Sequence, residues 1–81
     1  MRKEDNEFMR TLVRGIKEKG FNLSGRIVIT QPILLNSIRT YYEFRTDKAV
    51  RQRAKFLVAE GMFTLQGFNF ELTEKAKKEF G

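Results

Sequence analysis

The order of apolar and polar residues along the first twenty positions has the period of an α-helix. Five apolar side chains fall on one stripe of such a helix: Phe8, Met9, Leu12, Val13 and Ile16. Residues three and four apart share a helix face, so this spacing predicts an amphipathic helix over residues 4–19. Gly20 follows it, as glycine commonly does at a helix C-terminus. We expect Phe21 and Leu23 to fold back onto the core.

A β-branched run and a second helical pattern come next. Residues 26–30, Arg-Ile-Val-Ile-Thr, predict a short strand because β-branched side chains favour extended backbone. Pro32 suits the first turn of a helix, where its missing N–H costs nothing. The apolar stripe of this second helix is expected from Leu34, Leu35, Ile38 and one of Tyr41 and Tyr42. Residues 42–45 should form the turn that ends it.

Thr46 introduces a third helical pattern. Threonine is a favoured N-cap, and a carboxylate in the first turn, here Asp47, is stabilised by the helix dipole. The helix is predicted over residues 47–60 and should stop before Gly61. Its expected buried face consists of Val50, Ala54 and Leu57, with Val58 as a further candidate.

After Gly61 the period changes from helical to alternating, which predicts a β-hairpin. A two-residue turn at 66–67 brings apolar residues opposite each other, Leu65 with Phe68 and Phe63 with Phe70. Stacking of these rings on single-stranded nucleic acid is an alternative, but the alternation favours a buried hairpin face for all three phenylalanines.

Thr73 is expected to cap a last helical segment, residues 74–80. The predicted order is therefore helix, strand, helix, helix, hairpin and closing helix, which is an α+β fold. A chain of 81 residues is the length of one domain, so residues 1–81 are expected to form a single unit.

The net charge of the chain is +6, from 16 basic and 10 acidic residues. Residues 45–55 contain five basic residues against Asp47 alone, so +4 of this charge falls within eleven positions. Such clustering indicates a localised anion-binding face. The alternative is a solvated helix face that serves solubility.

Several functional classes are disfavoured by composition. The chain contains no cysteine and no histidine, so it offers no disulfide, no thiolate nucleophile, no Ser-His-Asp triad and no Cys or His metal ligand. The six glycines are dispersed, and no two carboxylates are spaced for acid–base work. We therefore expect no enzyme activity, no catalytic residue, no metal, no cofactor and no small-molecule substrate.

Nothing in the sequence suggests export or membrane insertion. No apolar run approaches the ~18 residues of a membrane span, and the N-terminus turns acidic where a signal peptide would turn apolar. The expected location is the cytoplasm, in association with nucleic acid.

Two strings carry a resemblance to a known family. The segment AVRQRAKFLVAEGMF, followed by LTEKAKKEF, resembles the winged helix-turn-helix family of small DNA-binding regulators. The size and basic balance are also similar to those of regulators from archaea and their viruses or plasmids. The resemblance implies three helices, a small antiparallel sheet with a hairpin wing, and a short C-terminal helix. It further implies a sequence-specific regulator of transcription that binds double-stranded DNA and reads its major groove with the helix at about residues 47–60.

The residues expected at the DNA follow from this placement, since the N-terminal half of a recognition helix faces base edges. We expect Arg51 and Gln52 to read bases, and Lys48 and Lys55 to contact bases or phosphates. At the helix start, the residues placed for phosphate contact are Arg45 and Thr46. Gln52 as an uncommitted surface residue is an equal alternative.

Outside this helix the expected contacts are fewer. The wing tip, residues 65–69, carries no lysine or arginine, so we expect at most modest backbone contacts from Gln66 and Asn69. Arg26, beside the wing, is a candidate phosphate contact. For Arg53 a structural salt bridge and a phosphate contact are both open.

The sequence leaves other partners open. The first helix is the expected element of a homodimer, because pseudo-palindromic operators require a two-fold protein. One alternative function is a winged-helix module that binds protein or RNA. Another is a non-specific architectural DNA-binding protein.

Overall fold

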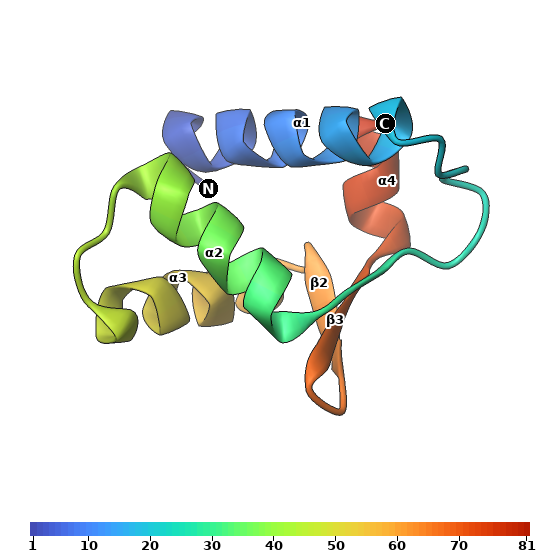
Figure 1. The fold of residues 1–81 in the computed structure, drawn as a ribbon. Coiled ribbons are helices and arrows are strands. Elements are labelled where there is room, and N and C mark those ends of the chain that lie inside the picture. Colours follow the sequence, from blue (N-terminus) through green and yellow to red (C-terminus); the bar gives the residue numbers. More distant parts are fainter.

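We describe a computed structural model that covers residues 1–81. Its elements follow in the order α1 (Lys3–Glu18), β1 (Val28–Ile29), α2 (Gln31–Tyr42), α3 (Asp47–Ala59), β2 (Phe63–Gln66), β3 (Asn69–Leu72) and α4 (Glu74–Phe80) (Figure 1). The predicted α+β class is confirmed, with four helices and a three-stranded antiparallel sheet. This order fits a winged-helix layout. None of the helices combines the length and the apolarity that crossing a membrane requires.

The predicted helix caps are confirmed in atomic detail. The Thr46 hydroxyl accepts a hydrogen bond from the Ala49 N–H at 3.2 Å, and the Thr73 hydroxyl accepts one from the Ala76 N–H at 3.1 Å. Each bond satisfies one of the free N–H groups of a helix N-terminus. Gly61 has a positive φ of 80° just beyond α3, a conformation that costs glycine little.

The hairpin differs from the predicted register. The turn lies at residues 67–68 rather than 66–67, so Leu65 faces Phe70 and Phe63 faces Leu72. Gly67 has φ 65°, and a two-residue turn of the II′ class places its positive-φ glycine first. Because apolar residues face each other in both registers, alternation could not distinguish them.

Two phenylalanines expected in the core are exposed. Phe68 occupies the second position of the hairpin turn and is 83% exposed, so it lies on neither face of the sheet. Phe21 follows the chain reversal at Gly20 and is 58% exposed, whereas Leu23 does pack against the core as expected.

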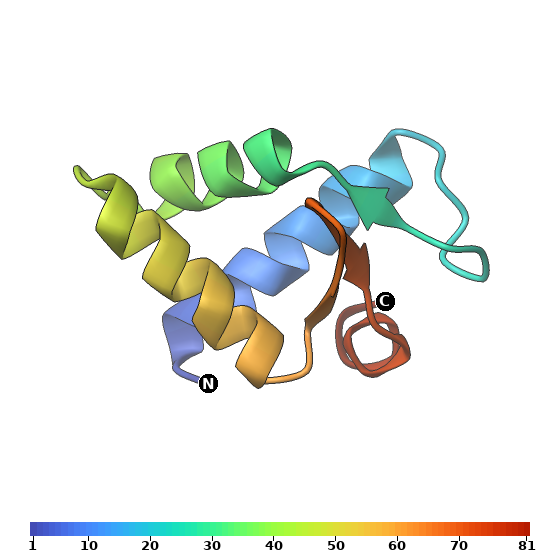
Figure 2. The ribbon, with the colours of Figure 1, turned by 90° about the horizontal axis from the view of Figure 1, so that it is seen from below.

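The sheet has the strand order β1-β3-β2, so β1 is an edge strand. It spans two residues instead of the predicted five, because only Val28 and Ile29 pair with β3. In the view from below, α2 and α3 diverge from the turn that joins them, and the hairpin lies at the open side of the angle between them (Figure 2). The core between these elements contains fifteen buried apolar residues, from Phe8 in α1 to Ala76 in α4.

A buried aspartate, which no sequence pattern predicted, joins the first three helices. Asp5 in α1 is fully buried and accepts hydrogen bonds from the Tyr42 hydroxyl at 2.6 Å, the Arg53 guanidinium at 3.0 Å and the Arg2 N–H at 3.1 Å. The Arg53 guanidinium also lies over the rings of Tyr42 and Phe56, at 5.1 and 5.2 Å. Burial, followed by the bond to Asp5, raises the pKa of Tyr42 well above its usual value.

Candidate nucleic-acid interface

A tight turn sets the angle between α2 and α3. Residues 43–46 connect the two helices, and Glu43 adopts the left-handed conformation with φ 57° and ψ 37°. The Phe44 N–H donates to the Arg39 carbonyl at 3.2 Å, and the Arg39 guanidinium forms an ion pair with Asp47. A connection of three or four residues is typical of a helix-turn-helix.

Helix α3 divides into an apolar inner face and a charged outer face. Val50, Ala54 and Leu57 are buried, as predicted. The side chains expected at the DNA are all exposed: Arg45, Thr46, Lys48, Arg51, Gln52 and Lys55. The structure thus brings these six residues together at the start and along the outer face of one helix.

The three cations of this outer face form no ion pair within the chain. Arg51 lies three residues after Lys48 and four before Lys55, so like charges are helix-surface neighbours. Such pairs destabilise a helix by about 0.2–0.5 kcal/mol each. Their clustering therefore destabilises the folded protein when nothing is bound, and an anionic partner would remove this repulsion.

Other arginines are engaged by carboxylates. Arg53 forms its ion pair with the buried Asp5, so of the two alternatives for this residue the structure contains the salt bridge. Arg26 pairs with Glu71 at 2.7 Å, a bond that raises the pKa of Arg26 and lowers that of Glu71. Phosphate contact by Arg26 would therefore compete with an existing exposed ion pair.

The hairpin tip presents an uncharged surface. Gln66 and Asn69 face each other and close the turn, as the last paired residues of β2 and β3. Leu65 is 59% exposed beside them, and Phe68 projects from the turn. Figure 1 shows this tip and α3 at the same lower side of the molecule, and both face the viewer in Figure 2.

Three residues that were not expected at the DNA adjoin this face. A shallow cleft of about 290 Å³ between α2 and α3 is lined by Gln31, Asn36 and Arg39 together with Arg51. Gln31 begins α2, and a helix N-terminus favours anions. The preference of helix N-termini for anions could have identified Gln31 from the sequence. The positions of Asn36 and Arg39 depend on how the two helices cross, which the sequence does not show.

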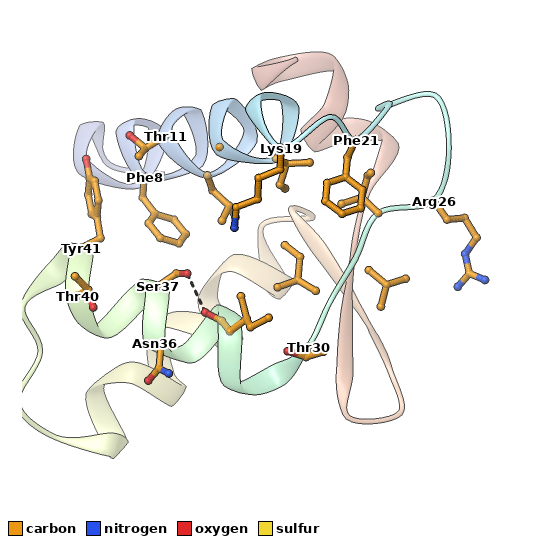
Figure 3. Close-up of a pocket in the computed structure, with 17 residues that line it drawn as sticks. Phe8, Thr11, Lys19, Phe21, Arg26, Thr30, Asn36, Ser37, Thr40 and Tyr41 are labelled. Atoms are coloured by element: carbon orange, nitrogen blue, oxygen red, sulfur yellow. Dashed lines mark hydrogen bonds between the residues drawn. The ribbon is translucent and has the colours of Figure 1, made fainter.

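A second hollow lies away from α3. A groove of about 820 Å³ runs between α1, β1 and α2 (Figure 3). Four of the seven exposed large apolar residues of the protein line it: Phe21, Val28, Ile33 and Tyr41. Gly15 also lines it, and a Cβ added there would meet no atom within 4 Å. The groove is therefore an apolar surface with room for a second chain to approach α1 closely.

Comparison with known proteins identified no relative of this chain. No protein-family model matches it, and neither a curated protein nor a solved structure does.

Proposed function

We propose that the protein is a winged helix-turn-helix regulator of transcription that binds double-stranded DNA in the cytoplasm. The observation that supports this function best is the outer face of α3, where Lys48, Arg51 and Lys55 are exposed without an intramolecular counter-charge. An α-helix fits the major groove of B-DNA, and cations on such a helix neutralise the flanking phosphates.

Each residue of this face has a role in the proposed complex. Arg51 donates two hydrogen bonds to a guanine edge, and Gln52 pairs with an adenine edge. Lys48 and Lys55 contact bases or phosphates on either side. At the start of α3, phosphate contacts come from Arg45 and Thr46 and fix the register of the helix.

We further propose that two copies associate through the groove between α1 and α2. Its exposed apolar side chains, among them Phe21 and Ile33, would leave water in such a dimer. A two-fold dimer presents two copies of α3 to the half-sites of a pseudo-palindromic operator.

Two other functions remain as alternatives. A winged-helix module that binds protein would not require three unpaired cations on the outer face of α3. One that binds RNA would use them on phosphates, but side chains of α3 could not read the deep, narrow major groove of A-form RNA. A non-specific architectural DNA-binding protein would require the cations, but would not need the base-reading chemistry of Arg51 and Gln52. A specific regulator and an architectural protein differ in the ratio of their affinities for a preferred duplex and for random DNA, and not in their fold.

The test is a selection of duplexes from a random library, followed by fluorescence anisotropy on the selected and random duplexes. A specific regulator should bind the selected duplex at least ~1,000-fold more tightly than random DNA. Equal affinity for all duplexes would identify an architectural protein. No duplex binding at low salt would reject the proposal and favour a protein or RNA partner.

A further inference from the structure

The most exposed large apolar side chain of the protein is Phe68, at 83%, and it stands at the tip of the hairpin. The turn is held by Gly67, with its positive φ, and by the pairing of Gln66 with Asn69. The ring therefore projects from a short, hydrogen-bonded hairpin rather than from a long loop. A partner that covers this ring would remove apolar surface from water, which favours binding at the tip.

The position of the ring indicates which partner covers it. The hairpin tip lies at the same side of the molecule as α3 (Figures 1 and 2). A duplex held by Lys48, Arg51 and Lys55 would therefore extend past Phe68. The groove beside α1 is bounded by other elements, and Phe68 is not among its lining residues.

The chemistry of the tip matches one mode of DNA contact. Residues 63–70 contain no charged side chain, so the tip does not add to phosphate neutralisation. It combines two amides, Gln66 and Asn69, with two exposed apolar side chains, Leu65 and Phe68. Proteins that enter the minor groove use amides to read its base edges and apolar side chains to wedge between base pairs.

We propose that Phe68 inserts between base pairs from the minor groove next to the site of α3 and bends the duplex. This inference rests on the proposed function, because it requires DNA bound by α3. The bend should fall within the range of about 20–90° that apolar wedges produce. It should favour pyrimidine–purine steps, which unstack most easily.

The experiment compares the wild type with Phe68→Ala and Phe68→Leu on a duplex that carries one site and a donor–acceptor pair at its ends. Energy transfer at saturating protein gives the bend, independently of affinity. A 2-aminopurine placed at successive steps reports local unstacking. Thr64→Ala is the control, because it shortens an exposed side chain of the same hairpin that lies away from the tip and outside both the α3 face and the groove beside α1. Circular dichroism confirms that each variant is folded.

We expect the wild type and Thr64→Ala to bend the duplex, Phe68→Leu to bend it less, and Phe68→Ala to leave it straight with roughly tenfold weaker binding. A wild-type complex with straight DNA, or a bend retained by Phe68→Ala, would overturn the wedge while leaving DNA binding intact. Loss of the bend in Thr64→Ala as well would also overturn it. Absence of wild-type binding would instead be a failure of the proposed function.

Discussion

Substitution of Asp5 tests how α3 is held in place. In Asp5→Ala the Arg53 guanidinium loses its counter-charge and the Tyr42 hydroxyl loses its acceptor. Removing one partner of a buried ion pair costs about 3–5 kcal/mol. The Arg53 side chain is 20% exposed and still lies over two aromatic rings, so the lower end of this range, about 3 kcal/mol, applies.

The magnitude is large for a chain of this size. A domain of 81 residues has a free energy of unfolding of about 4–12 kcal/mol. A loss of about 3 kcal/mol lowers the Tm by about 12–24 °C, since each kcal/mol corresponds to about 4–8 °C in small domains. Urea and thermal denaturation, followed by circular dichroism, measure both quantities.

The chain contains its own control, because Asp47 is the only other aspartate. Its side chain is 81% exposed and pairs with Arg39 at the surface, so Asp47→Ala should cost no more than about 1 kcal/mol. Asp5→Asn, which keeps the shape and one acceptor, should lie between the two alanine variants. If Asp5→Ala were no more destabilising than Asp47→Ala, the buried network would not be what positions α3.

Four further predictions concern single side chains. Lys55→Ala should reduce the slope of log affinity against log salt by about one unit. Arg51→Ala should cost about 1–3 kcal/mol of specific binding free energy and relax the sequence preference at one base pair. Fluorescence anisotropy at several salt concentrations measures both effects. Because the pKa of Tyr42 is raised, the folded state keeps the hydroxyl proton at a pH where the unfolded state releases it. The resulting contribution to the free energy of unfolding is complete below pH ~10 and declines as the pH rises above that value. Tyr42→Phe should remove this decline in urea titrations at alkaline pH, and an unchanged dependence of the unfolding free energy on pH would contradict the assignment. Ile33→Lys should shift the protein from dimer to monomer in light scattering, and a monomeric wild type would reject the proposed dimer.

Local signals predicted most of the elements. Thr46 and Thr73 were identifiable as N-caps because a threonine directly before a segment of helical periodicity favours that role. The inner face of α3 followed from spacing alone, and so did the separation of its cations from that face. The outer face of the candidate site was therefore predictable from the sequence.

Features that depend on distant partners were not predictable. Asp5 is buried because Arg53, 48 residues away, reaches it, and no local pattern encodes that contact. The hairpin register differed because a shift of the turn by one position exchanges one set of apolar pairs for another. The exposure of Phe68 depended on that same shift, so the apolar tip of the hairpin emerged only from the structure.

The proposed function requires that the outer face of α3 binds duplex DNA. The most direct measurement is an NMR titration of the labelled protein with a selected duplex, reading amide and side-chain shifts residue by residue. We expect the largest changes at residues 45–55, with Arg51, Gln52 and Lys55 foremost, and a second set at residues 65–69. Changes confined to the groove between α1 and α2, or none at all at low salt, would contradict it.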